Sequence, residues 1–125
     1  MQKGVVVSIL VALVLTIETQ AKYKEYTANV SAYCPCKICC GKWSEMKPQR
    51  TASGHIVKKG DKFIAAPKSI PFGTMYVIEG YNNSSPVPVL DRGGAIKGNC
   101  LDLFFDTHAE ALKWGRKIMK VKIID

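Results

Sequence analysis

The sequence predicts a mainly β protein, a small barrel of six short strands with one short C-terminal helix. Three observations lead to this prediction. The 125 residues, 47% of them hydrophobic, suffice for one compact domain. Short runs of β-branched and aromatic residues recur between Gly, Pro and Asn residues that favour turns. A helix start pattern occurs near the C-terminus, and closing the strands into a barrel removes the exposed edges of a small open sheet.

The first 21 residues are predicted to be a signal peptide. Lys3 precedes an apolar run over residues 4–17, which at about 1.5 Å per residue reaches about 21 Å, less than a hydrocarbon core of about 30 Å. Thr19 and Ala21 place a small residue on each side of Gln20, as a signal peptidase requires. We therefore expect residues 22–125 to form the mature domain, secreted into the cell envelope or periplasm and not attached to a membrane. An uncleaved N-terminal anchor is the alternative.

The predicted strands follow in order from the first mature residues to the end of the chain. They cover residues 26–33, 63–66, 75–80, 87–90, 101–105 and 121–124. A cysteine-rich segment and a polar loop separate the first two strands, and turn-forming residues separate the others. Pro88 lacks a backbone N–H, so its strand is expected at an edge.

The predicted helix begins at Thr107 and continues through Arg116. Thr107 and Glu110 have the spacing of a capping box, in which each residue satisfies a polar group of the first turn. Asp106 is expected to belong to the entry of this helix. His108 is expected in its first turn and not in a catalytic site.

Two carboxylates are candidates for chemistry. Asp91 precedes Arg92 and two glycines, Gly93 and Gly94, where the backbone can turn sharply and a ligand can come close. Asp102 lies within an apolar strand, and poor solvation raises the pKa of a carboxyl group toward the range of a general acid. Asp102 is therefore the stronger candidate.

The stretch around these carboxylates resembles a known family. Residues 91–105 read DRGGAIKGNCLDLFF, preceded by IPFGT at 70–74 and followed by EALKWGR at 110–116. Together these segments resemble the three-aspartate (3D) domain, which is related to the catalytic domain of membrane-bound lytic transglycosylase A. The resemblance extends from about residue 27 to residue 124 and implies a six-stranded double-psi β-barrel.

The resemblance also implies an activity. The family cleaves peptidoglycan between N-acetylmuramic acid and N-acetylglucosamine without water, and leaves a 1,6-anhydro end. Asp102 matches the residue that acts as acid and then base, and Asp91 matches the supporting carboxylate. The expected substrate-binding residues are Lys97, Gly93, Gly94, Thr74 and Trp43, and no cofactor or metal is implied. Ala66 stands where the family has its third Asp, and Cys100 stands where relatives often carry Arg.

The five cysteines allow several interpretations. Cys34, Cys36, Cys39 and Cys40 lie within seven residues, and Cys100 stands apart. Disulfides are the first expectation outside the cytoplasm. A structural zinc held by the four clustered thiols, with or without His55, is a second interpretation, and free thiols are a third. The sequence does not choose the pairing.

The net charge of +8 favours an anionic partner. Peptidoglycan glycan strands fit this requirement and the family resemblance. Because Ala66 replaces an Asp, a non-catalytic peptidoglycan-binding or wall-loosening module on the same barrel is the alternative function. A nucleic-acid partner is not expected, since the basic residues are scattered and the leader directs the chain out of the cytoplasm.

Overall fold

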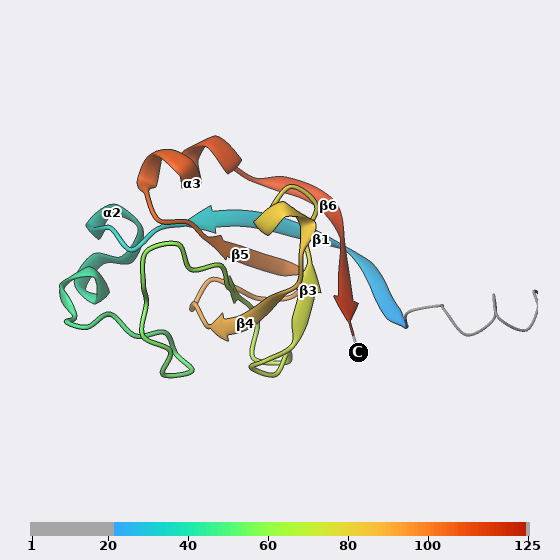
Figure 1. Cartoon of the computed structure of the whole chain (residues 1–125), viewed down its shortest axis with the longest axis horizontal. Coiled ribbons are helices and arrows are strands. Elements are labelled where there is room, and N and C mark those ends of the chain that lie inside the picture. The colour runs from blue at the N-terminus through green and yellow to red at the C-terminus, as the bar shows by residue number, and fades with distance from the viewer. Residues whose placement is uncertain (1–21, 125) are drawn as a thin grey trace, which may run out of the picture.

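Six strands form a closed barrel in the computed structural model, which describes residues 22–124 (Figure 1). The predicted signal peptide therefore lies outside the described residues. Around the barrel the order is β1-β5-β2-β4-β3-β6, and each strand pairs with two neighbours. The strands are β1 (Tyr23–Tyr33), β2 (Ile64–Ala65), β3 (Met75–Val77), β4 (Val87–Asp91), β5 (Cys100–Phe104) and β6 (Lys117–Ile124).

The prediction of six strands and a mainly β fold is confirmed. Two strands are longer than expected, because β1 from Tyr23 to Val30 pairs antiparallel with the whole of β6. The edge position expected for Pro88 is wrong, since β4 pairs with both β3 and β2. Pro88 is tolerated because the paired register with β2 begins only at Val89.

β1 and β5 run parallel, and this pairing determines what meets at one end of the barrel. The register places Ser31 opposite Asp102 and Tyr33 opposite Phe104. The chain segments that follow both strands therefore leave the barrel at the same end, where α2 (Lys37–Cys40) lies beyond β1 (Figure 1).

The helix α3 (His108–Trp114) confirms the predicted C-terminal helix. Thr107 is its N-cap and accepts a hydrogen bond from the backbone N–H of Glu110 at 3.2 Å, while the Thr107 hydroxyl donates to the Glu110 carboxylate at 2.8 Å. Trp114 at the other end donates from its indole N–H to the Val30 carbonyl at 3.2 Å. These contacts fix α3 against β1.

The cysteine-rich segment was not predicted to be helical. It forms α2 and a 3-10 turn, η1 (Gly41–Glu45). A second 3-10 turn, η2 (Asn82–Ser84), lies in the predicted loop before β4. The extra helices are short and have no buried residues, so no apolar periodicity indicated them.

Alternate residues of each strand fill the barrel. One fully buried residue from each strand illustrates the pattern: Val30, Ile64, Tyr76, Val89, Leu103 and Val121. Outside this core, the rings of Phe63 and Phe104 stack with centroids 4.4 Å apart. The buried Tyr81 hydroxyl contacts the backbone of both residues, which ties the segment before β2 to β5.

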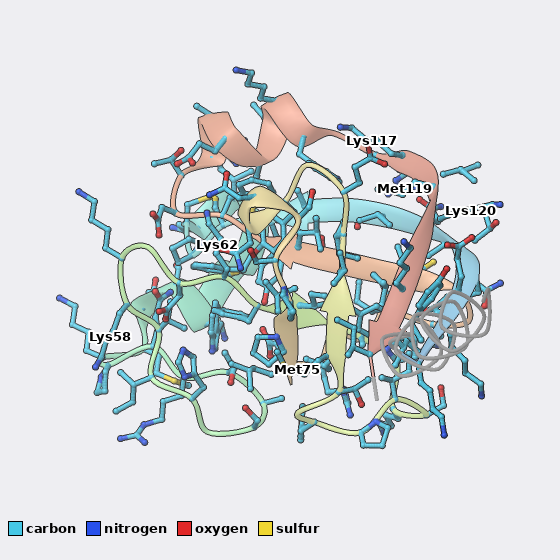
Figure 2. The ribbon with its side chains drawn as sticks, turned by 45° about the vertical axis from the view of Figure 1, so that its right-hand side comes forward. Lys58, Lys62, Met75, Lys117, Met119 and Lys120 are labelled. Carbon is cyan, nitrogen blue, oxygen red and sulfur yellow. The ribbon has the colours of Figure 1, made fainter. Side chains whose placement is uncertain are left out.

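Within residues 22–124, no helix has the length and apolar character needed to cross a bilayer. The labelled lysines lie on separate parts of the surface (Figure 2). Lys58 extends from the loop before β2, whereas Lys117 and Lys120 belong to β6 on the opposite side of the view. The positive charge is therefore distributed over several elements.

Candidate active-site cleft

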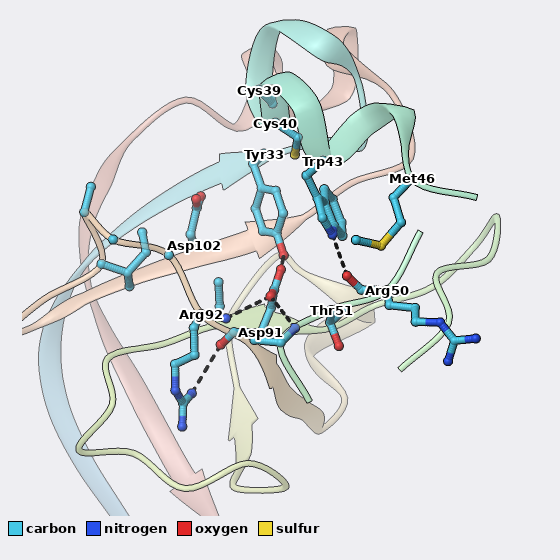
Figure 3. Close-up of a pocket in the computed structure, with 16 residues that line it drawn as sticks. Tyr33, Cys39, Cys40, Trp43, Met46, Arg50, Thr51, Asp91, Arg92 and Asp102 are labelled. Carbon is cyan, nitrogen blue, oxygen red and sulfur yellow. Dashed lines mark hydrogen bonds between the residues drawn. The ribbon is translucent and has the colours of Figure 1, made fainter. Parts of the chain in front are cut away.

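A cleft of about 610 Å³ opens where three strands bring Asp91 and Asp102 together (Figure 3). Ala65 on β2 is paired with Asp91 of β4 on one side and with Asp102 of β5 on the other. All three residues line the cleft. Because the side chain between the two carboxylates is only a methyl group, both can face the same space. The structure thus places the two sequence-predicted carboxylates in one site.

The Asp91 carboxylate is held by three donors. Oδ2 accepts from the Tyr33 hydroxyl at 2.6 Å, and Oδ1 accepts from the backbone N–H groups of Ala52 and Arg92, each at 2.9 Å. Only 8% of the residue is exposed. Hydrogen bonds from neutral donors stabilise a buried carboxylate ion and hold it in one orientation. Asp91 is therefore positioned as a fixed negative charge.

Asp102 has a different environment. Burial, assisted by the nearby negative charge of Asp91, raises the pKa of its carboxyl group to about 6. The Ser31 hydroxyl donates to Oδ1 at 3.0 Å and, together with the charge of Arg116, acts in the opposite direction. Two carboxylates in one cleft thus have separate tasks, since one is fixed as an ion and the other can carry a proton near neutral pH.

Ser31 and Tyr33 are site residues that the sequence analysis missed. Both project from β1 beside the carboxylates, and burial raises the pKa of the Tyr33 hydroxyl, so it remains a hydrogen-bond donor. Their spacing of two residues indicates a shared face of the strand. No local pattern indicated that this strand pairs with the strand that carries Asp102.

The opposite wall of the cleft comes from η1 and the following loop. Trp43 donates from its indole N–H to the Arg50 carbonyl, and both residues line the cleft, as Figure 3 shows. The placement of Trp43 is compatible with the predicted role in sugar stacking, which stays a prediction. Asp106 is not part of this cleft; its carboxylate accepts from the Gly60 N–H at 2.9 and 3.0 Å and anchors the loop at the helix entry.

A second hollow of about 480 Å³ lies next to the cleft and shares Arg92, Gly93, Gly94 and Ile96 with it. Lys97 lines this second hollow and not the first. A Cβ added at Gly93 would lie 2.9 Å from Ile96 Cγ1, so a larger residue there would require the Ile96 side chain to shift. The two hollows therefore adjoin each other along the loop that carries these shared residues.

Arg92, the residue after Asp91, contacts the backbone of the surrounding loops. The Arg92 guanidinium donates to the carbonyls of Ala66, Ile70 and Asp91, and lies 4.0 Å from the Phe72 ring centroid. It therefore braces the loop instead of pairing with a carboxylate.

Thr74 was expected to bind substrate. Its hydroxyl donates to the Pro71 carbonyl at 2.7 Å, and it does not line either hollow. Its predicted contact with substrate stays a prediction.

All five cysteines, which lie within the described residues, are free thiols. The expected disulfides are thus not present; the sulfurs of Cys34 and Cys36 are 2.9 Å apart, whereas a disulfide bond is about 2.05 Å long. The zinc interpretation also named the wrong histidine. His55 binds Asp61 at 2.8 Å, and His108 lies among the cysteines.

Comparisons with known proteins support a relationship to cell-wall proteins. Residues 62–125 match the family model described as 3D domain. Among relatives from Bacillus subtilis (strain 168), YabE, whose given name assigns it to cell wall shaping, is 34% identical over 116 residues, 90% of this chain. The cell wall-binding protein YocH is 38% identical over 78 residues, 60% of this chain. The chain spans 26% of the length of each of these relatives.

A solved structure is also similar. The crystal structure of MltA from E. coli matches with 25% identity and a TM-score of 0.47, over 62% of this chain and 28% of that chain.

Proposed function

Because the chain belongs to the 3D domain family, we propose that it is a peptidoglycan lytic transglycosylase that cleaves the bond between N-acetylmuramic acid and N-acetylglucosamine. The observation that carries the proposal is the pair of carboxylates in one cleft, of which Asp102 has a pKa raised to about 6 and Asp91 is held by three donors. The fold is proposed to be the double-psi form of the barrel.

The proposed reaction uses one proton. Protonated Asp102 donates to the glycosidic oxygen, and the bond from that oxygen to C1 of the muramyl ring breaks. The C6 hydroxyl of the same ring attacks C1, and its proton passes to the Asp102 carboxylate. The products are a 1,6-anhydromuramyl end and a free 4-hydroxyl on N-acetylglucosamine. No water is consumed, so a second carboxylate to activate water is not needed, in contrast to ordinary glycosidases.

Asp91 and the adjoining hollow support this reaction. The fixed charge of Asp91 stabilises positive charge that develops on the muramyl ring, and keeps the Asp102 pKa high. The second hollow, with Lys97, Gly93 and Gly94 on its wall, suits neighbouring sugars of a polymer. Trp43 offers an aromatic face on the opposite wall.

The names of the relatives support the substrate class and the location. One is named for cell wall shaping and the other for cell wall binding. We propose that this chain likewise acts on peptidoglycan outside the cytoplasm. The net charge of +8 would concentrate it on anionic wall polymers.

A non-catalytic wall-binding module is the second candidate, and one observation favours it. The family's third Asp is replaced by Ala66, which is completely buried and lines the second hollow. In this case the two hollows would bind glycan strands without cleaving them.

Digestion of purified peptidoglycan separates the two candidates. The purified chain is incubated with peptidoglycan, and the soluble products are analysed by mass spectrometry. Anhydromuropeptides support the lytic reaction, and their absence with Asp102→Asn assigns the acid. Binding to peptidoglycan without new anhydro ends would overturn the enzymatic proposal and support the binding module. Glu79→Gln, which changes an exposed carboxylate outside the cleft, is the matched control and should retain activity.

A further inference from the structure

Three cysteines and one histidine form a compact cluster at the end of the barrel, beside the cleft that holds the two carboxylates. Their ligand atoms, the sulfurs of Cys34, Cys36 and Cys39 and a ring nitrogen of His108, all lie within 4.8 Å of one another. From these residues we propose a structural zinc site of the Cys3His type. The proposal does not depend on the lytic reaction, because it concerns residues outside the proposed chemistry.

The topology explains why residues so far apart in sequence meet. Cys34 directly follows the last residue of β1, and His108 begins α3 four residues after the end of β5. β1 and β5 are parallel, and the Phe105 N–H continues the pairing by donating to the Tyr33 carbonyl at 2.8 Å. Both chain segments therefore leave the sheet at the same point, and His108 is directed at the cysteines.

The distances agree with a tetrahedral centre. His108 Nδ1 lies 3.7 Å from the sulfur of Cys34, 3.6 Å from Cys36 and 3.4 Å from Cys39. With Zn–S bonds of about 2.3 Å and Zn–N bonds of about 2.0–2.1 Å, a tetrahedron separates nitrogen from sulfur by about 3.5 Å. The match extends to all three cysteines.

The sulfur–sulfur distances need only a small adjustment. Cys34 lies 2.9 Å from Cys36 and 3.4 Å from Cys39, whereas sulfurs of one tetrahedral zinc are about 3.8 Å apart. A metal would therefore move these side chains by less than about 1 Å.

The chemistry of the ligands favours zinc over calcium and magnesium. Three thiolates and an imidazole are soft or intermediate donors, unsuited to calcium or magnesium, which prefer oxygen. Four protein ligands complete a tetrahedron and leave no open position for a substrate, as in structural zinc sites. Cys40 is outside the cluster, since its thiol donates to the Cys34 carbonyl at 3.1 Å.

The site is placed to organise one wall of the cleft. Tyr33, which donates to Asp91, immediately precedes Cys34, and Cys39 itself lines the cleft. α2 and η1 bury no residue and so have few apolar contacts to hold them. A metal that joins α2 to the start of α3 would fix this segment where Trp43 lines the cleft.

The test is metal content measured on the purified full chain. Protein prepared without chelator and under anaerobic conditions should contain about one zinc per chain by elemental analysis. Cobalt(II) added after zinc removal should give thiolate-to-cobalt charge-transfer absorption and the visible bands of a tetrahedral ion. Cys39→Ser and His108→Ala should lose both signals, whereas the control variants Cys100→Ser and His55→Gln should keep them.

His108→Cys keeps the proposal testable if the alanine variant does not fold. A fourth thiolate at this position should retain zinc and shift the cobalt spectrum toward that of four sulfur ligands. Less than one-tenth of an equivalent of zinc in a folded chain with free thiols would overturn the proposal. So would a disulfide among Cys34, Cys36 and Cys39 in protein isolated without reductant, detected by alkylation and mass spectrometry.

Discussion

Replacing Asp102 by Asn should stabilise the protein at neutral pH while it removes the proposed acid. Burial raises the pKa of Asp102 from 3.8 to about 6. The folded protein therefore binds this proton more tightly than the unfolded chain, and the free energy of unfolding falls as pH rises from about 4 to about 6. Above pH 6 the partly buried Asp102 carboxylate is ionised and lowers the free energy of unfolding, whereas Asn carries no charge.

The size of this stability change follows from the shift in the pKa of Asp102. A change of about two pKa units corresponds to at most about 3 kcal/mol, since one unit is about 1.4 kcal/mol. Asp102 is partly open to the cleft, so solvent reduces this to about 1–2 kcal/mol. For a domain of this size we expect a melting temperature about 4–10 °C higher than that of the unmodified chain at pH 7.5. The Ser31 hydroxyl can still donate to the amide oxygen, so packing is preserved.

The assay is thermal and urea unfolding of both proteins at pH 4 and pH 7.5. The difference in unfolding free energy should be close to zero at pH 4 and favour Asn at pH 7.5. An equal difference in unfolding free energy at pH 4 and pH 7.5, or a less stable Asn variant at pH 7.5, would refute the reasoning. Glu79→Gln removes an exposed carboxylate and should change stability by less than about 0.5 kcal/mol at either pH.

Three further predictions concern the lytic reaction. The rate constant kcat/KM for release of anhydro products should fall about tenfold per unit above about pH 6, because Asp102 must be protonated; a rate that rises over that range contradicts the assignment. Tyr33→Phe removes the 2.6 Å hydrogen bond to Asp91 and should lower kcat at least tenfold, whereas the exposed Tyr23→Phe should not. Asp91→Asn removes the charge that raises the Asp102 pKa, so the descending limb of any remaining pH–rate profile should move to lower pH; an unmoved limb would argue against that coupling.

Local patterns were sufficient to predict the six strands and the C-terminal helix, but not the short helices α2, η1 and η2. The apolar run around Asp102 predicted a strand over residues 101–105, and in β5 the flanking Leu101 and Leu103 are both buried, since side chains of a strand alternate between its faces. The helix start at Thr107 was equally local, because a capping hydroxyl acts on an N–H only three residues ahead. The motif also identified Asp91 and Asp102 as candidates before their shared cleft was known.

Strand pairing was decided only in the tertiary structure. Ser31 and Asp102 are 71 residues apart, and no local property of either strand specifies that they lie side by side in parallel. The same pairing brings His108, not His55, to the cysteines. The pairing of β4 with both β3 and β2 likewise places Pro88 within the barrel and not at an edge.

The sequence by itself therefore determined which segments become strands and helix and which carboxylates could do chemistry, because those properties depend on near neighbours along the chain. The tertiary structure alone decided which side chains surround them, because burial and hydrogen bonding depend on contacts between residues distant in sequence. The raised pKa of Asp102 illustrates the difference. The apolar residues beside Asp102 in the sequence predicted that its pKa would be raised. The contribution of Asp91 to that pKa arises only in the closed barrel, which brings the two carboxylates together.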